Sequence, residues 1–140
     1  MIAIVPIAND QIAGLWPRIG GYLLAGAAVD EDAQMDEALA DIANGRARVW
    51  MIVDCDRVTA AFLTSCTTDS DGRCLDVYGL GGSGMLRWGK KLTQAMIDYA
   101  RQAQCNRVVF KGRKALLRAY PGVRIVGTDA PGRYIFERAV

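Results

Sequence analysis

The sequence predicts one α+β domain, residues 1–140, with a mixed, mostly antiparallel sheet and helices on both of its faces. Its length fits a single domain that buries roughly two thirds of its unfolded surface. Two stretches with helical spacing precede three consecutive strand-like stretches, a pattern typical of an antiparallel meander. Helices and strands then alternate, which places two strands in parallel. The predicted order is β-α-α-β-β-β-α-β-α-β-β.

The first part of the chain supplies one strand and two helices. Residues 2–7 form a short apolar strand. Apolar residues recur at helical spacing over 12–24, where Pro17 predicts a kink or two helical pieces. Acidic residues at 30–32 begin a second helix, which Asn44-Gly45 ends.

Three strands then follow as an antiparallel meander, over residues 48–53, 58–67 and 74–80. Their β-branched and small residues favour extended structure. The turn between the second and third strands has a strong signal, Asp69-Ser70-Asp71-Gly72.

A long amphipathic helix follows, with apolar residues in steps of three and four from Met85 to Ala103. The next strand, 107–110, is reached through this helix and is therefore expected to run parallel to the third meander strand. A short helix over 114–120 and two strands, 123–126 and 134–138, complete the chain.

Composition and charge exclude several classes of function. The formal net charge is +2 and the basic residues are spread along the chain, whereas nucleic-acid binding needs them clustered on one face. No apolar run approaches the roughly 18 residues that span a bilayer, and no signal peptide opens the chain. We therefore expect a cytoplasmic protein that binds neither membranes nor nucleic acids.

The chain has four cysteines and no histidine. Cys55, Cys66, Cys74 and Cys105 show no C-x-x-C pairing, so the usual zinc ligand sets cannot be assembled and no metal is expected. The missing imidazole also excludes Ser–His and Cys–His nucleophile pairs. Cys66 and Cys74 fall on neighbouring predicted strands, but no basic group is evidently placed to activate them. We interpret the four as buried, reduced thiols.

A glycine-rich run stands between the third meander strand and the long helix: Leu80-Gly81-Gly82-Ser83-Gly84. Gly and Ser let the backbone approach a ligand closely. The helix start behind them presents unpaired N–H groups and the positive end of a dipole, which favour an anion. The run therefore predicts phosphate binding. The alternative is a flexible turn in which Ser83 caps the helix.

Over the whole chain the element order resembles the GNAT (Gcn5-related N-acetyltransferase) superfamily, since few small α+β domains place two helices ahead of a three-strand meander. In that family the fourth strand, its turn and the next helix hold the pyrophosphate of acetyl-CoA. Pantetheine lies where the fourth and fifth strands splay apart. The corresponding segments here are 74–80, 81–84, 85–104 and 107–110.

The family signature, Arg/Gln-x-x-Gly-x-Gly/Ala at the start of that helix, is only partly present. When Gly89-Lys90-Lys91-Leu92 is aligned with its end, Gly89 is the one match. Gly84 then stands where Arg or Gln is usual, and Arg87 where Gly is usual. The loop either binds pyrophosphate in a shifted register or is degenerate. The runs Val-Val-Phe-Lys-Gly-Arg and Tyr-Pro-Gly are also similar to small GNAT-like proteins encoded with phage and prophage genes.

The resemblance implies that the cofactor is acetyl-CoA or CoA. Backbone N–H groups from Gly82 to Met85 would bind its pyrophosphate, and Val77 to Gly79 would pair with its pantetheine arm. The implied cofactor-binding residues are Val77, Tyr78, Gly79, Gly81, Gly82, Ser83, Gly84, Met85 and Gly89.

Asp76 is the first candidate for acid–base chemistry under this resemblance. It interrupts a predicted strand, where Asp is disfavoured, and the family often has a general base on or near this strand. An amine must lose its proton before it attacks a thioester, which a carboxylate can assist. The plainer interpretation, which we prefer, is a solvent-facing Asp on a half-exposed sheet.

Tyr120 is the second candidate, as the acid that protonates the leaving thiolate. The family often has such a Tyr in the helix after the fifth strand. The family spacing, anchored on Ala115, places that Tyr at the position of Ala119, so Tyr120 comes one residue late, about 100° around a helix. The plainer interpretation, again preferred, is that Tyr120 packs the helix end beside Pro121.

These features favour an acyl-CoA-dependent N-acyltransferase, or a degenerate relative, that acetylates a small-molecule or peptide amine by direct attack. The alternative is a non-enzymatic GNAT-fold structural or interaction protein of phage or prophage origin that has lost the cofactor. Its partner would be a phage protein or a second copy, which could pair through the predicted edge strand 134–138.

Overall fold

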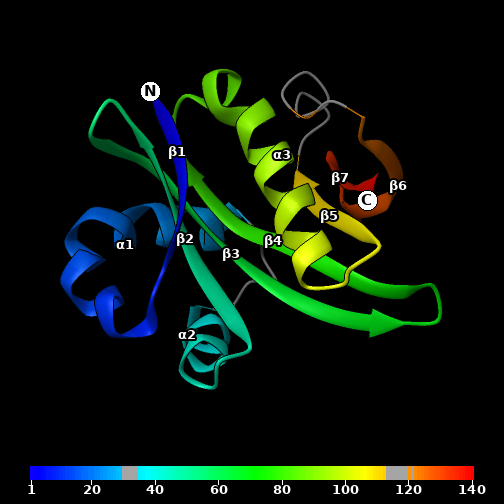
Figure 1. Cartoon of the computed structure of the whole chain (residues 1–140), viewed down its shortest axis with the longest axis horizontal. Coiled ribbons are helices and arrows are strands. Elements are labelled where there is room, and N and C mark those ends of the chain that lie inside the picture. Colours follow the sequence, from blue (N-terminus) through cyan, green and yellow to red (C-terminus); the bar gives the residue numbers. More distant parts are fainter. Residues whose placement is uncertain (30–34, 113–119, 121) are drawn as a thin grey trace. The chain divides into compact units, whose positions relative to one another are not determined.

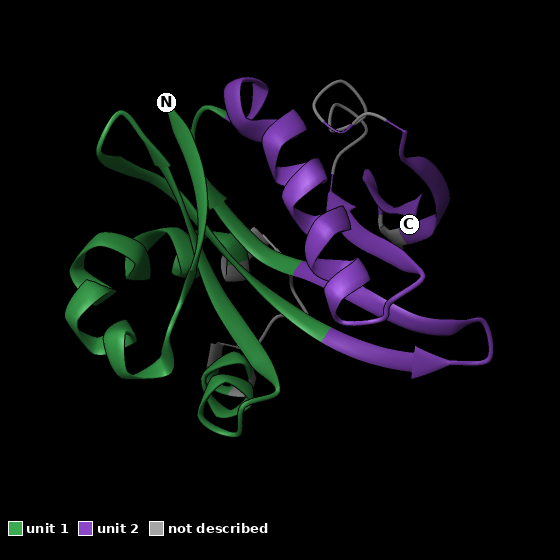
Figure 2. Ribbon diagram, viewed as in Figure 1, with its two compact units in different colours: residues 1–65, 78–84 green, residues 66–77, 85–140 purple. Residues whose placement is uncertain are grey.

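The computed structural model describes residues 1–29, 35–112, 120 and 122–140 (Figure 1). The chain divides into two compact units, which we call unit 1 (residues 1–65 and 78–84) and unit 2 (residues 66–77 and 85–140; Figure 2). The predicted short helix over 114–120 lies outside the described residues except for Tyr120, and so do the acidic residues 30–32.

The element order agrees with the predicted one over the described residues. The strands are β1 (Ile2–Ile7), β2 (Ala47–Asp54), β3 (Arg57–Asp69), β4 (Gly72–Gly82), β5 (Arg107–Gly112), β6 (Arg124–Ala130) and β7 (Arg133–Ala139). The described helices are the 3₁₀ turn η1 (Asn9–Gln11), α1 (Ile12–Val29), α2 (Met35–Ala43) and α3 (Met85–Gln102).

The strands form one seven-stranded sheet in the order β1-β2-β3-β4-β5-β7-β6. Strand β1 is antiparallel to β2, β2 to β3, and β7 to both β5 and β6. Strands β4 and β5 are parallel, over a ladder from Cys74–Arg107 to Val77–Phe110. The mixed, mostly antiparallel sheet of an α+β domain is therefore confirmed, and the parallel pair falls where a helical crossover joins two strands.

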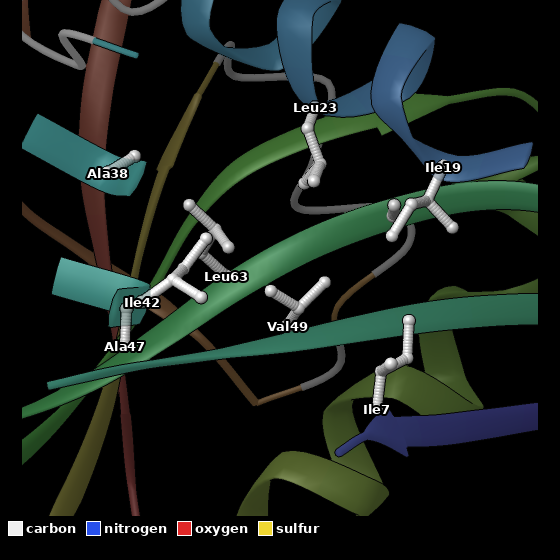
Figure 3. Close-up of a cluster of buried hydrophobic side chains, with 9 residues drawn as sticks. Ile7, Ile19, Leu23, Ala38, Ile42, Ala47, Val49 and Leu63 are labelled. Carbon is white, nitrogen blue, oxygen red and sulfur yellow. The ribbon is translucent and has the colours of Figure 1, made fainter. Parts of the chain in front are cut away.

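Unit 1 buries a cluster of apolar side chains drawn from its helices and strands (Figure 3). Ile19 and Leu23 come from α1 at helical spacing and meet Val49 of β2 and Leu63 of β3. Helix α1 continues through Pro17 from Ile12 to Val29. The two separate helical pieces that Pro17 was expected to allow are therefore not formed.

Unit 2 has a buried core of its own. The predicted inner face of α3 is buried at its centre, through Trp88, Leu92 and Met96. Leu75 of β4 and Phe136 of β7 are fully buried in the same unit. Burying side chains of this size supplies roughly 1.5–3 kcal/mol each.

Strand β4 is longer than the sequence suggested, and its extension changes the glycine-rich run. The expected strand ended at Leu80, but β4 continues through Gly81 and Gly82. Helix α3 begins at Met85, so Gly84 directly precedes it and Ser83 lies one residue earlier than the capping position expected for it. A strand can continue through glycine where neighbouring backbones come close. The low β propensity of glycine does not predict this, because propensity depends on the residue alone and not on its neighbours in space.

Within the described residues, no helix is both long enough and apolar enough to cross a membrane.

Candidate functional site

The end of β4 lies in direct backbone contact with α1, inside unit 1. A Cβ added to Gly81 would stand 2.0 Å from the carbonyl oxygen of Tyr22 in α1. A Cβ added to Gly26 in α1 would stand 2.2 Å from the carbonyl oxygen of Gly79. No side chain fits between such backbones, so glycine on both elements lets them touch.

Gly82 is held in the same way against β3. Its φ is +137°, and a Cβ there would stand 2.4 Å from the Thr59 carbonyl oxygen. The next residue, Ser83, donates its backbone N–H to that same oxygen at 3.0 Å. Of the N–H groups predicted to bind pyrophosphate, that of Ser83 is thus occupied within the protein.

The start of α3 fits an anion better than the glycines before it. Gly84 has a φ of +82° and leads into a helix of 18 residues that begins at Met85. Leu86, in the first turn, is 77% exposed, so this helix start meets solvent. The first N–H groups of a helix have no intrahelical partner and carry its positive partial charge. These groups can therefore bind a phosphate.

The remaining predicted cofactor residues occupy packed positions in their own units. Val77 is 4% exposed and pairs with Phe110. Tyr78 packs against the apolar cluster of unit 1. Gly89, the one match to the family signature, is buried in α3 and its carbonyl accepts a hydrogen bond from Thr93 Oγ1 at 2.9 Å.

The carboxylate of Asp76 is held by two neighbours in unit 2. Thr67 Oγ1 donates to its Oδ2 at 2.9 Å, and the thiol of Cys74 donates to its Oδ1 at 3.6 Å. Burial and then the negative charge of Asp76 raise the pKa of Cys74 to about 12, so this thiol keeps its proton at neutral pH. Asp76 is half-buried rather than fully solvent-facing, and its carboxylate has a fixed direction.

Tyr120 is 1% exposed and stacks on Phe110, with ring centroids 4.7 Å apart and an interplanar angle of 13°. Its hydroxyl has no hydrogen-bond partner among the described residues. Burial raises the pKa of Tyr120, so the hydroxyl stays protonated. A buried hydroxyl without a partner is unfavourable for folding.

The two candidate catalytic side chains lie on opposite faces of the β4–β5 ladder. Side chains alternate along a strand, so Asp76 and Val77 point to opposite faces. Phe110 pairs with Val77 and carries Tyr120 on its ring, which puts Tyr120 on the Val77 face. The carboxylate of Asp76 instead shares the face of Cys74, its hydrogen-bond partner.

Two side-chain clusters of unit 2 went unrecognised in the sequence. Arg107, with a side chain 12% exposed, forms ion pairs with Asp69 and Glu137, and Glu137 also pairs with Arg124. The sulfur of Cys66 lies 3.8 Å from that of Cys105, and Arg73 interacts with both. Cys55 and Cys66 are exposed, so the expectation of four buried thiols is wrong for these two. The contributing residues are far apart in sequence, so only strand pairing could have indicated them. Among the described residues, no group of three potential ligands could hold a metal ion.

The chain matches no known family model and no curated protein sequence. It is similar in structure to an IAA acetyltransferase from Bacillus cereus ATCC 14579, with 13% identity and a TM-score of 0.67 over 100% of both chains. It is also similar to an acetyltransferase of the GNAT family from Streptococcus agalactiae 2603, with 14% identity and a TM-score of 0.60 over 99% of this chain and 95% of that one.

A third similar structure is a predicted acetyltransferase from Clostridium acetobutylicum, solved with acetyl-CoA. Its identity is 11% and its TM-score 0.56, over 84% of this chain and 87% of that one. These comparisons do not support the expected phage or prophage origin. The likeness extends along the whole chain at 13–14% identity, and the chain has the fold of the GNAT acetyltransferases.

Proposed function

We propose that this protein transfers an acyl group from acyl-CoA to an amine. The observation that carries the proposal is the full-length likeness to an acetyltransferase of equal extent, at a TM-score of 0.67. The structure solved with acetyl-CoA supports the choice of donor. One fold hosts many functions, so the proposed activity also requires residues that can bind the donor and transfer protons.

In this proposal the start of α3 binds the pyrophosphate through the N–H groups of Gly84 and Met85. Strand β4 pairs with pantetheine along Val77, Tyr78 and Gly79. Acetyl-CoA supplies the acyl group as an activated thioester when it is bound. The other glycines contribute indirectly, because their packing fixes where β4 ends and α3 begins.

Asp76 is proposed as the general base. Its carboxylate, oriented by Thr67 and Cys74, accepts a proton from the acceptor amine, which must be neutral to attack a thioester. Tyr120 is proposed to hold a proton at its Oη for the leaving thiolate, which requires the thioester to pass the end of the β4–β5 ladder, because Tyr120 lies on the face opposite Asp76. Its buried hydroxyl, which has no partner among the described residues, is free of a competing hydrogen bond there.

A second candidate function is that of a non-enzymatic interaction protein. The observation that favours it is the use of the glycine-rich run for packing: Gly81 contacts α1, Gly82 contacts β3, and the Ser83 N–H bonds Thr59. A run fully explained by the fold need not bind a ligand. The two functions differ in whether CoA binds at all.

A thermal-melt series with acetyl-CoA, CoA and ADP tests binding. We expect a stabilisation of about 2.7 kcal/mol at a hundredfold excess over Kd. Leu86→Glu places a negative charge in the first turn of α3, which suits the helix but repels pyrophosphate, and should weaken binding at least about tenfold. Leu39→Glu, the same change at an exposed position of α2, is the matched control and should bind as the unaltered protein does. The absence of a shift with all three ligands at millimolar concentration would overturn the CoA-dependent function.

Release of free CoA with a panel of small-molecule and peptide amines tests transfer. Asp76→Asn removes the proposed base and should lower kcat/KM by about 100-fold or more. Asp98→Asn removes an exposed carboxylate from α3 and should leave the rate unchanged. Full activity in Asp76→Asn would show that Asp76 is a structural residue.

A further inference from the structure

Cys66 and Cys105 lie side by side in unit 2, at 39 residues' separation along the chain. The thiol of Cys105 donates to the sulfur of Cys66, with the two sulfur atoms 3.8 Å apart. Cys66, on β3, is exposed, whereas Cys105, which follows α3, is buried. One thiol of the pair is therefore accessible to a reagent, and the other is within reach of it.

A positive charge stands at this pair. Arg73, on β4, lies near enough to Cys66 and Cys105 to interact with both, and these interactions raise the pKa of its guanidinium. A nearby cation stabilises the negative charge that a sulfur carries during thiol–disulfide exchange. The site thus combines two sulfurs and the charge that assists their reaction.

Backbone and side-chain hydrogen bonds hold the two segments of this site together. Asn106, next to Cys105, donates its backbone N–H to the carbonyl of Arg73 at 2.9 Å. Its side-chain amide donates to the carbonyl of Asp71 at 2.8 Å, in the β3–β4 turn. These bonds hold the segment of Cys105 against β4, which neighbours the strand of Cys66 in the sheet.

The other two cysteines lack this environment. Cys74 is buried, holds its proton on account of its raised pKa, and bonds a carboxylate. Cys55 is exposed, and its sulfur accepts a hydrogen bond from the N-terminal ammonium of Met1 at 3.4 Å, but no cysteine sulfur is bonded to it among the described residues. Exposure alone thus does not distinguish Cys66. Its neighbours do.

We propose that Cys66 and Cys105 are a redox-active pair, which a low-molecular-weight disulfide oxidises to an intramolecular disulfide. The site belongs to unit 2 and does not depend on acyl transfer.

The reaction has two exchange steps. The thiolate of Cys66 attacks one sulfur of the small disulfide, forming a mixed disulfide and releasing one small-molecule thiol. Cys105 then attacks the Cys66 sulfur, forming the Cys66–Cys105 bond and releasing the second thiol. The protein loses two electrons and two protons, and the small disulfide gains both. Burial raises the pKa of Cys105, which leaves it as the thiol that reacts second.

The test uses the full chain with Cys55→Ser, so that Cys66 is the accessible cysteine that remains. Oxidised glutathione should convert the reduced protein to a form lighter by two hydrogen atoms, and a Cys66–Cys105 peptide should appear on digestion and disappear with dithiothreitol. With Cys105→Ser added, glutathione should instead remain attached to Cys66. Circular dichroism of each variant confirms its fold.

A stable glutathione adduct on Cys66 in the protein that retains Cys105, or unreacted Cys66, overturns the proposal. Arg73→Gln tests the charge and should slow the first exchange step severalfold. Arg101→Gln, at an exposed position of α3, is the matched control and should react at the unaltered rate. Equal rates in both variants would remove Arg73 from the site.

Discussion

Strand β4 passes through both units, and its two halves are held in different ways. In unit 1 its end meets α1 and β3 backbone to backbone, with glycine on either side of the contact. In unit 2 the first half of β4, Gly72 to Val77, makes its contacts through side chains. Leu75 is buried, and Cys74 and Asp76 are hydrogen-bonded to each other.

The two halves of β4 should differ in which substitutions they tolerate. A backbone contact depends on the absence of a side chain, so any added atom must displace main chain. A contact between side chains depends on their shape and protonation state, and both can change with sequence or pH. Unit 1 should therefore be sensitive to added volume and unit 2 to added charge.

The largest expected effect is that of Gly26→Ala in α1. Its Cβ would meet the Gly79 carbonyl at 2.2 Å, which should lower the free energy of unfolding by about 3 kcal/mol or more. Gly21→Ala, in the same helix with nothing within 4 Å, should raise it by about 0.5–1 kcal/mol. Urea unfolding measures both. If the two variants are equally stable, the backbone contact does not limit unit 1.

The alkaline stability of unit 2 should depend on Cys74. Its pKa rises from 9.0 to about 12 on folding, through burial and the charge of Asp76. The neutral thiol is thus favoured in the fold, so its contribution is complete below pH 9 and is lost as pH rises toward 12. We expect a loss on the order of 2 kcal/mol between pH 9 and about pH 10.5, measured by unfolding in the presence of a phosphine reductant.

Cys74→Ala should flatten this decline, whereas Cys55→Ala, at an exposed site, should retain it. Part of the loss of stability at high pH should remain in Cys74→Ala, because burial also raises the pKa of Tyr120. Identical pH profiles for all three proteins would show that Cys74 ionises without consequence for the fold.

The smallest expected effects come from one tyrosine in each unit. Tyr22 donates its hydroxyl to the Val58 carbonyl at 3.1 Å, so Tyr22→Phe should cost about 1 kcal/mol. Tyr120 has a buried hydroxyl with no partner among the described residues, so Tyr120→Phe should stabilise by about 1 kcal/mol. Chemical denaturation of the two variants compares them. A destabilised Tyr120→Phe would indicate that its hydroxyl is bonded in solution.

Much of the fold could be predicted because its signals are local. The apolar residues of α3, which include Trp88, Leu92 and Met96, recur at helical spacing. The turn residues from Asp69 to Gly72 predict the hairpin that leads into β4. The parallel pairing of β4 with β5 follows from the helix between them. The length of β4 could not be predicted, because Gly81 and Gly82 are extended through contacts with Tyr22 and Thr59.

Hydrophobic periodicity and turn residues act over a few positions, so the order and type of the elements can be predicted from the chain alone. The glycine-rich run before α3 can be located in the same way. What the run does depends on tertiary packing, because the atoms that Gly81 and Gly82 exclude belong to α1 and β3. The same holds for Cys66 and Cys105, which strand pairing brings to 3.8 Å. Sequence separation conceals such contacts, and the packing of the chain creates them.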